Sequence, residues 1–434
     1  MVPQLKNIWL FKEKNLLGDT FIIHHFRDFF WLSIGVGFYS LVVFLVNLYT
    51  AKILGPKIFG IWNFISLFVI YGSFLHLGVI NGLGREIPYY IGKNRYDLVE
   101  KVKVISFYFV VFISICFFCI VNITCIFYNK SIEIKNYLFL ISILFFSKEI
   151  QDYVRIYLRS NLNFKKMGQQ YLISSLLLGV LVYFFVQKMG LQGFILAQFL
   201  AFIISSFLFF EPPKFDIRIL KYDKEIFLSL LNVGFPIMMA GYLYNLLTSI
   251  DRLIVVKYLG ITSLGQYSLV IIALGVISFF PSVISNLVYP RMAKNFGENN
   301  NVTVLKKYIK AQVLWGWIFI LPIFILFYFV FPLFVKKFMP LYIEGIIPLK
   351  IVLLGTLFLP LAAGFGDFLN TIGKQIYYLI TQIICLLTNL VLTFIFVNIF
   401  KLGLKGAAIG TAFAYCIYGL LLFYISLHYV LKKC

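Results

Sequence analysis

Long apolar runs separated by short polar loops fill almost the whole sequence. A helix that spans a bilayer needs about 20 consecutive, mostly apolar residues. The runs reach or approach that length without turn residues, whereas a barrel strand would have about ten residues of alternating polarity. The pattern therefore predicts an all-helical membrane protein with about twelve spans. The predicted spans cover residues 29–52, 61–83, 104–127, 137–157, 169–187, 192–210, 230–256, 265–289, 309–334, 346–369, 376–399 and 406–430.

Composition supports a membrane location for nearly the whole chain. Of the 434 residues, 61% are hydrophobic and 13% are charged, against about 45–50% and about 25% in an average soluble domain. Twelve spans leave no segment for a separate soluble domain. Residues 1–28 precede the first apolar run and lack a small-residue cleavage site, so we expect a retained, cytoplasmic lead-in at the membrane surface.

The loop charges predict an orientation. Cytoplasmic loops of membrane proteins carry an excess of Lys and Arg. If loops are assigned alternately to the two sides, the side of the N-terminus holds 25 of the 38 Lys and Arg residues. We therefore expect both termini in the cytoplasm. The net charge of +21 is spread through these loops rather than gathered in one patch, which argues against a nucleic-acid partner.

The sequence also repeats itself. A shift of 205 residues pairs Gly55 with Gly260 and Gly60 with Gly265, and a shift of 213 pairs Gly190-Leu-Gln-Gly193 with Gly403-Leu-Lys-Gly406. Because each half would contain an even number of spans, the halves would share one orientation around an axis along the membrane normal. The predicted fold is thus two six-helix lobes related by a pseudo-two-fold axis. Its segments are 1–28, the lobe 29–210, a cytoplasmic linker 211–229 and the lobe 230–434.

Charged residues inside apolar spans are the main functional candidates, because an ionisable group in hydrocarbon is costly. Lys148, Asp152, Arg155 and Arg159 are spaced by four, three and four residues in one predicted span, so they form a stripe along one helix face. The stripe should face protein or water, which suggests a cavity-facing role for Lys148 and Arg155. Two alternatives remain: Asp152 could neutralise Lys148 or Arg155, and Arg159 could mark the helix end. Glu149 is a further carboxylate of this span.

Other charged candidates lie in other spans. Asp251 and Arg252 are adjacent, so their side chains point about 100 degrees apart on a helix, and each should meet a partner elsewhere. Asp251 could couple an ion or clamp two spans together. Asp367 lies near a span end, while Arg85 and Arg291 occupy cytoplasmic exits where they could contact substrate or simply anchor the helix.

Missing motifs narrow the chemistry. The sequence contains no G-x-x-x-x-G-K-[ST] phosphate loop, no D-x-D and no H-E-x-x-H, so no feature supports ATP hydrolysis, metal-dependent glycosyl transfer or metalloproteolysis. We expect no catalytic residue, no metal site and no cofactor apart from coupling to H+ or Na+. A cavity rich in cations and aromatic side chains suits an anionic, sugar-bearing molecule.

Several short motifs together resemble the polysaccharide transporter family, the O-antigen flippases of the multidrug, oligosaccharidyl-lipid and polysaccharide exporter superfamily. Each motif is short, but their order and spacing extend over nearly the whole chain. They are Leu54-Gly55-Pro56-Lys57-Ile58-Phe59-Gly60-Ile61-Trp62, Gly84-Arg85-Glu86-Ile87-Pro88, Gly234-Phe235-Pro236, Asp251-Arg252, Leu259-Gly260 with Gly265-Gln266-Tyr267, and the paired G-L-x-G sequences.

The resemblance implies that the protein lies in the bacterial inner membrane and moves an undecaprenyl-pyrophosphate-linked oligosaccharide from the cytoplasmic to the periplasmic leaflet, among membrane lipids and other polysaccharide assembly proteins. In that interpretation Lys148, Arg155, Arg159, Arg252, Arg85 and Arg291 would contact substrate, and Glu149, Asp152, Asp251 and Asp367 would serve ion coupling or structural pairing. Two alternatives stay open. One is a drug or cation antiporter of the same superfamily, which should show unpaired carboxylates. The other is a membrane enzyme such as a polysaccharide polymerase, which usually needs a larger external loop.

Overall fold

The computed structural model describes residues 19–127, 132–161, 163–211, 223–279 and 302–431, together with 281–285, 288–289, 292 and 296. Within these ranges the regular structure is entirely helical, without a strand. A helix satisfies all backbone polar groups inside one segment, which is why it is suited to a solvent that offers no hydrogen bonds. The prediction of an all-helical membrane protein is confirmed.

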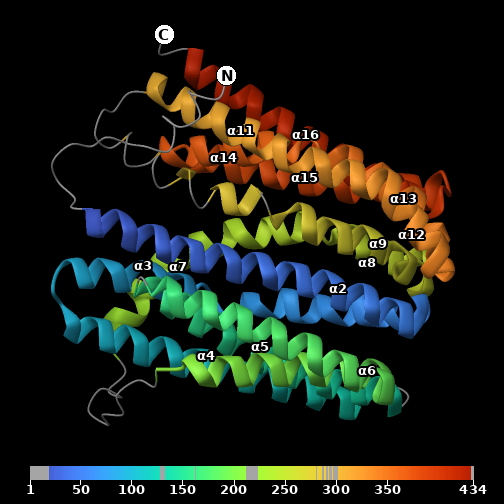
Figure 1. Ribbon diagram of the computed structural model, residues 1–434, viewed down its shortest axis with the longest axis horizontal. Helices are drawn as coiled ribbons and strands as arrows, with labels where there is room; N and C mark the ends of the chain where they lie inside the picture. The colour runs from blue at the N-terminus through green and yellow to red at the C-terminus, as the bar shows by residue number, and fades with distance from the viewer. Residues whose placement is uncertain are drawn as a thin grey trace.

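Figure 1 shows the helices in their order along the chain. The first part of the chain forms α2 (Asp19–Gly72), η1 (Ser73–His76), α3 (Val79–Gly92), α4 (Tyr96–Phe127), α5 (Ile132–Ser160), α6 (Phe164–Phe209) and α7 (Lys224–Leu247). The second part forms α8 (Ile250–Leu259), α9 (Ile261–Ile277), α11 (Val302–Ile325), η2 (Leu326–Val330), α12 (Phe331–Phe338), η3 (Pro340–Gly345), α13 (Ile346–Thr356), α14 (Leu359–Thr371), α15 (Gln375–Phe394), η4 (Ile395–Ile399) and α16 (Gly403–Leu431).

Nine helical stretches among the described residues are long and apolar enough to cross a membrane. Two of them, in α2 and α6, are 47 and 46 residues long, well beyond the roughly 20 residues of one crossing. Both contain a glycine with non-helical backbone angles, Gly55 in α2 and Gly190 in α6. Each of these helices therefore consists of two helical segments, in agreement with the two predicted spans within it.

Glycines paired by the sequence repeat adopt matching conformations. Gly55 has φ 71° and ψ 170°, and Gly260 has φ 87° and ψ 173°. Gly190 and Gly403 have φ values of 56° and 58°. Residues with a side chain rarely adopt such positive φ values, so glycine is required at these turns. The shared backbone shape supports the predicted repeat.

Three predicted spans are interrupted in the structure, which corrects the expectation of continuous helices there. The span 61–83 breaks at Leu77 and Gly78, both with positive φ. The span 230–256 breaks between α7 and α8, and the span 346–369 breaks between α13 and α14. Hydropathy averaged over a span does not detect such breaks: Leu357 and Phe358 at the third are apolar, and Thr248 and Ser249 at the second are too few to change the average. Most of the predicted segment 1–28 and most of the predicted linker 211–229 lie outside the described residues.

Helix α2 lies between α4, α5 and α6 on one side and the helices from α8 onward on the other (Figure 1). It packs closely against α9 through two glycines: a Cβ atom added to Gly60 would lie 2.1 Å from the Ile261 carbonyl oxygen, and one added to Gly265 would lie 1.7 Å from the Pro56 carbonyl oxygen. Side chains of any size would keep these backbones apart. Small residues allow such close approach in membranes, where packing rather than the hydrophobic effect holds helices together.

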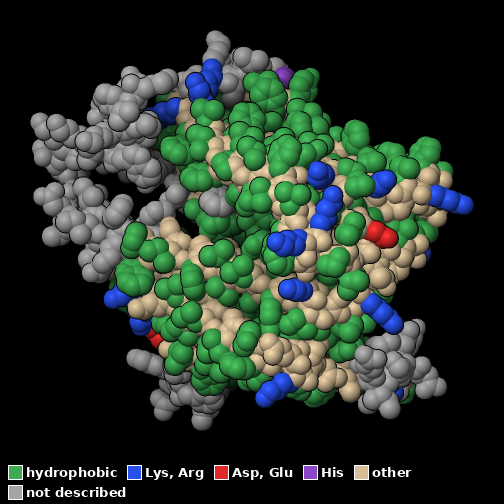
Figure 2. Space-filling view, turned by 45° about the vertical axis from the view of Figure 1, so that its right-hand side comes forward, with side chains coloured by type: hydrophobic (Ala, Val, Ile, Leu, Met, Phe, Trp, Pro, Cys, Tyr) green, Lys and Arg blue, Asp and Glu red, His purple; other side chains and the backbone are tan. Residues whose placement is uncertain are grey.

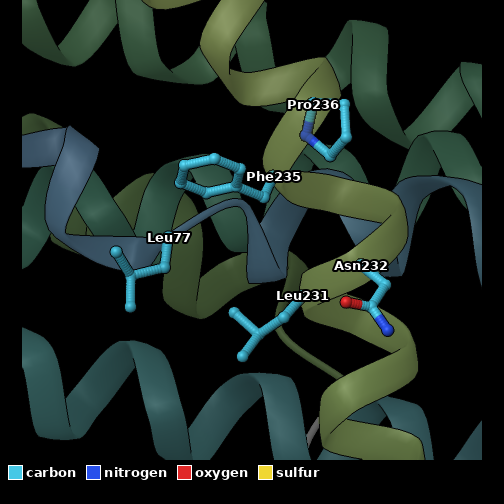
Figure 3. A pocket seen from close by; sticks show the side chains of 5 residues that line it. All are labelled: Leu77, Leu231, Asn232, Phe235 and Pro236. Atoms are coloured by element: carbon cyan, nitrogen blue, oxygen red, sulfur yellow. The ribbon is translucent and has the colours of Figure 1, made fainter.

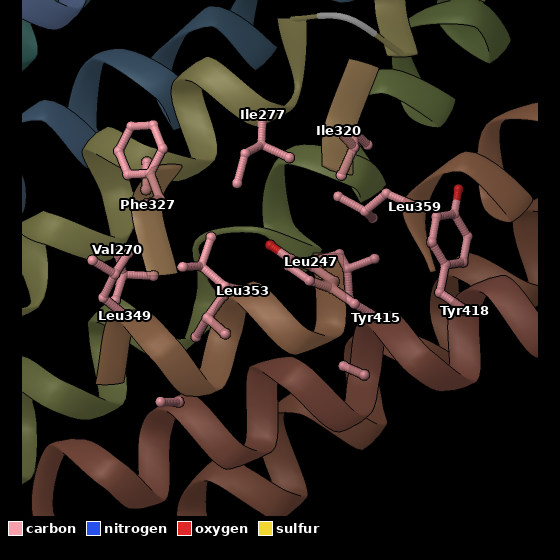
Figure 4. Close-up of a cluster of buried hydrophobic side chains, with 14 of the residues drawn as sticks. Leu247, Val270, Ile277, Ile320, Phe327, Leu349, Leu353, Leu359, Tyr415 and Tyr418 are labelled. Carbon is pink, nitrogen blue, oxygen red and sulfur yellow. The ribbon is translucent and has the colours of Figure 1, made fainter. Parts of the chain in front are cut away.

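The largest buried cluster belongs to the second part of the chain. It contains Leu247, Val270, Leu353 and Tyr415, and α2 contributes Leu48 to it (Figure 4). Two smaller clusters lie among α2 to α7. The buried core is thus divided between the two parts of the chain, and α2 contributes to both.

Exposed lysines gather on the end of the molecule that carries the glycine turns and η3. Figure 2 brings this end forward and shows the basic side chains among apolar ones. The exposed lysines near these turns are Lys52, Lys57, Lys188, Lys257, Lys336, Lys337, Lys401 and Lys405. Two pairs of them, Lys52 with Lys257 and Lys188 with Lys401, occupy matching positions of the repeat.

Candidate functional site

The charged stripe on α5 is divided among different environments. Lys148 and Asp152 form an ion pair one helical turn apart, with side chains 35% and 32% exposed. The structure thus favours the alternative in which Asp152 neutralises Lys148. Glu149, beside them in sequence, is buried, and neither of its carboxylate oxygens has a hydrogen-bond partner among the described residues.

Arg155 is buried and is not paired with a carboxylate in the part of the chain that the structure describes. Its guanidinium carbon lies 3.9 Å from the ring centre of Tyr171 and 4.9 Å from that of Tyr39. Its Nε donates a hydrogen bond of 2.8 Å to Gln170 Oε1. Arg155 Nη2 is buried without a partner among the described residues. Arginine stacks favourably on aromatic faces, so the site holds the cation in place and leaves one donor unused.

Neutral polar side chains extend this site between α5 and α6. Gln151 Nε2 donates to Ser174 Oγ at 3.0 Å, and Gln170 Nε2 donates to Ser205 Oγ at 3.3 Å. All four side chains are buried. Our sequence reasoning, which followed charge, missed them. The Gln and Ser residues inside apolar runs could have indicated this site, because buried polar groups need hydrogen-bond partners.

The remaining predicted arginines of the first part lie at the surface or outside the described residues. Arg159 is exposed, and its guanidinium lies over Gly84 of α3, at 3.4 Å from the position of an added Cβ. Arg85 is also exposed and forms an ion pair of 3.1 Å with Glu86. Arg291 lies outside the described residues. The structure therefore brings Arg159 close to Gly84, the residue before Arg85 in α3.

Asp251 is the centre of a second buried polar site, at the start of α8. Its Oδ2 accepts hydrogen bonds from the Tyr267 hydroxyl at 2.7 Å and the Thr411 hydroxyl at 2.8 Å. Its Oδ1 accepts the backbone N–H of Arg252 at 2.9 Å. Asp251 therefore has partners on α9 and α16, as expected for a residue that its neighbour does not neutralise. The Arg252 side chain is partly buried.

Further neutral groups surround Asp251. Asn389 on α15 donates to the Leu247 carbonyl oxygen at 2.9 Å, which caps the end of α7, and accepts a bond of 2.9 Å from Thr393. The Thr411 hydroxyl lies 3.5 Å from Asn389 Oδ1. The site thus joins α7, α8, α9, α15 and α16 around one carboxylate.

Asp367 on α14 belongs to a separate group. It accepts hydrogen bonds from Ser285 and from Gln312, the latter at 2.6 Å. It is partly buried and bridges α14 to α11. Among the described residues, no group of three or more His, Cys, Asp or Glu side chains is placed to hold a metal ion.

Comparison with known proteins identifies the family. A family model described as polysaccharide biosynthesis protein matches residues 49–339, which is more than half of the chain. The chain belongs to this family. The matched range contains most of the motifs on which the resemblance was based, including Asp251-Arg252, and the resemblance is confirmed. No curated protein matches the chain.

This polysaccharide biosynthesis family member is similar in fold to solved transporters. A transporter of the MOP superfamily from Pyrococcus furiosus Vc1 has a TM-score of 0.68 at 16% identity, covering 94% of this chain and 96% of that one. An inward-facing multidrug resistance MATE family transporter has a TM-score of 0.69 at 16% identity, with 93% and 94% covered. An outward-facing one has 0.68 at 17% identity, with 94% and 96% covered. The protein therefore shares the fold of these transporters and is a multi-pass membrane protein.

Proposed function

We propose that the protein is a flippase that moves an undecaprenyl-pyrophosphate-linked oligosaccharide from the cytoplasmic to the periplasmic leaflet of the bacterial inner membrane. Two lobes of six spans each, with both termini in the cytoplasm, would open alternately to the two sides. The family match and the transporter-like fold support transport in polysaccharide biosynthesis. The loop charges support the orientation.

Arg155 is the observation that carries this proposal. A buried cation is costly unless it is paired, yet Arg155 has two tyrosine rings, Gln170 and an unused Nη2 donor instead of a carboxylate. An arginine held this way can bind a phosphate oxygen by a charge-assisted hydrogen bond. A cation exporter would need the opposite charge at this place. An anionic cargo therefore fits the site best.

The energetic need for such a site is large. Each hydroxyl taken into hydrocarbon without a hydrogen bond costs roughly 2–7 kcal/mol, and a bare charge costs far more. A polar site within the helices offsets this cost for a sugar and its pyrophosphate. Lys148 lies about 10 Å along α5 from Arg155, so the two cations could contact successive positions of the headgroup as it moves, with Lys148 exchanging Asp152 for phosphate.

Asp251 is the better candidate for ion coupling. It is almost fully buried, with 2% of its surface exposed, and it is surrounded by hydroxyl and amide oxygens of Tyr267, Thr411 and Asn389. Oxygen ligands are those preferred by hard cations such as Na+, and the carboxylate could equally carry a proton. Glu149, buried without a partner, is the corresponding candidate in the first part of the chain.

Replacement of Arg155 and Lys148 tests the proposal. Arg155→Ala should abolish surface polysaccharide while the protein remains in the membrane, and Lys148→Ala should reduce it strongly. Arg95→Ala is the matched control, since the Arg95 side chain is exposed and, among the described residues, bonded only to Asp97. Surface polysaccharide is measured by immunoblot and protein level by a membrane-fraction blot. Undiminished polysaccharide in both Arg155→Ala and Lys148→Ala would reject the assignment.

A further inference from the structure

A cavity of about 410 Å³ lies where α7 passes the break between η1 and α3. Its lining residues are Leu77, Leu231, Asn232, Phe235 and Pro236. Figure 3 shows Leu231 and Phe235 projecting from α7 toward Leu77. The volume falls within the range of about 300–1,000 Å³ typical of small-molecule sites, and four of the five lining side chains are apolar.

The backbone around Leu77 creates this cavity. Leu77 and Gly78 have φ values of 50° and 84°, which stops the helix, and His76 Nδ1 accepts the Gly78 N–H at 3.0 Å. Beyond the break, α3 crosses α7 closely: a Cβ added to Gly234 would lie 1.9 Å from the Gly78 carbonyl oxygen. The crossing holds α7 against the break, while the missing helical turn leaves space beside it.

Apolar side chains are exposed around the cavity. Leu77 and Phe235 are 38% and 42% exposed although both are apolar. Leu231 and Phe235 continue the four-residue spacing of Phe227 on α7, and Phe227 contacts Phe109 of α4 at 5.1 Å between ring centres. Helix α4 also carries exposed apolar side chains. An exposed apolar lining of this kind suits an apolar chain.

Polarity changes along the cavity. Asn232 is the only polar lining residue, and its side chain has no hydrogen-bond partner among the described residues. It lies about 12 Å along α7 from Lys224, where the helix begins, whereas Phe235 and Pro236 lie deeper. The Asn232 side chain is exposed, so its amide is free to hydrogen-bond a ligand that enters the cavity. The order, polar near the helix start and apolar deeper, matches an amphiphile with its headgroup toward the cytoplasm.

The two sides of the break face different environments. Leu77 lines the cavity, while the preceding residue, His76, lies within electrostatic range of Lys148 and Asp152 on α5. One short segment thus separates the apolar cavity from the charged stripe. A lipid whose charged head lies at the stripe could place its chain in the cavity.

We propose that this cavity binds the polyprenyl chain of the lipid-linked substrate near its phosphate-bearing end. The chain then stays in hydrocarbon while the head enters among the helices, and Asn232 contacts a phosphate or sugar oxygen of the bound lipid. This inference rests on the proposed flippase function. It adds a lateral binding site for the lipid portion, at the crossing of α3 and α7.

Photo-crosslinking tests the site without requiring transport. The full-length protein in nanodiscs carries p-benzoylphenylalanine in place of Phe235, and radiolabelled undecaprenyl phosphate is the probe. The matched control carries the same group in place of Phe207, which is 73% exposed on α6. We expect several-fold more labelling at position 235. Excess unlabelled undecaprenyl phosphate should compete, and excess phosphatidylglycerol should not.

Two further variants are tested with p-benzoylphenylalanine at position 235. Leu231→Trp should fill the cavity and remove most of the labelling, and Asn232→Leu should reduce it about threefold, as expected for one hydrogen bond within a membrane. Equal labelling at positions 235 and 207, or equal competition by phosphatidylglycerol, would overturn the inference. Failure of the flippase assignment is seen separately, as normal surface polysaccharide in both Arg155→Ala and Lys148→Ala cells.

Discussion

The contact between α2 and α9 predicts that one methyl group added to Gly265 destabilises the protein. The new Cβ would lie 1.7 Å from the Pro56 carbonyl oxygen and 2.4 Å from its carbonyl carbon. Both are backbone atoms, so no side chain can rotate away, and the helices must separate. Overpacking of this kind typically costs about 1–3 kcal/mol. The gain in helix propensity from Gly to Ala, about 1 kcal/mol, is too small to offset a cost near the upper end of that range.

A second glycine of α9 provides the control. An added Cβ at Gly275 has no atom within 4 Å, so Gly275→Ala should leave stability unchanged or raise it by up to about 1 kcal/mol. Each variant adds one methyl group to α9, and only at position 265 does that group meet α2. Gly265→Ala should therefore lower stability, whereas Gly275→Ala should not.

Thermal unfolding of the purified protein in detergent, followed by tryptophan fluorescence, measures the difference. Gly265→Ala should unfold at a lower temperature than the parent protein, and Gly275→Ala at the same or a higher temperature. Equal midpoints for the two variants would refute the close packing of α2 against α9. Gly60→Ala, which introduces the same kind of clash from the α2 side, should behave like Gly265→Ala.

Other expected outcomes concern single interactions. Tyr342→Phe removes the 2.7 Å hydrogen bond to the Ala51 carbonyl oxygen and should lower stability by about 1 kcal/mol, measured by the same unfolding assay; no change would argue against this bond. Lys166, which donates to Glu211 at 2.8 Å, holds the pKa of that carboxyl below its usual range. This pair should therefore stabilise the protein above the unfolded-state pKa of Glu211, near 4.5, and lose its effect as pH falls through the lower folded-state value. Glu211→Gln should remove that part of the pH dependence of stability. Unfolding midpoints measured at several pH values would reveal the change. Asp251→Asn should abolish any dependence of transport on an ion gradient in proteoliposomes, and dependence equal to the parent's would reject the ion-coupling role.

Much of the helical architecture could be predicted because its signals are local. Apolar runs mark the spans, and glycines mark turns such as Gly55 and Gly190, where the backbone needs a positive φ. The break at Leu77 could not be predicted in this way, since leucine rarely adopts a positive φ. It depends on the His76 side chain and on the crossing with α7, which are tertiary features.

The candidate site was predictable only in part. Lys148, Arg155 and Asp251 were visible as charges within apolar runs. Their surroundings were not, because neutral residues far apart in sequence assemble them: Thr411, which bonds Asp251, is 160 residues away. The even spacing of the α5 stripe also suggested one shared environment. In the structure, the ion pair with Asp152 and the stacking on Tyr171 separate Lys148 from Arg155.

Gly60 of α2 meets the backbone of α9 at Gly265, so matched positions of the repeat face each other within one chain. A residue beside the two-fold axis of a symmetric dimer meets its own copy in the same way. Because the clash at each glycine is with backbone atoms of the other helix, a side chain at one position cannot be accommodated by a smaller residue at the other. Both positions must stay small for the two helices to remain in contact.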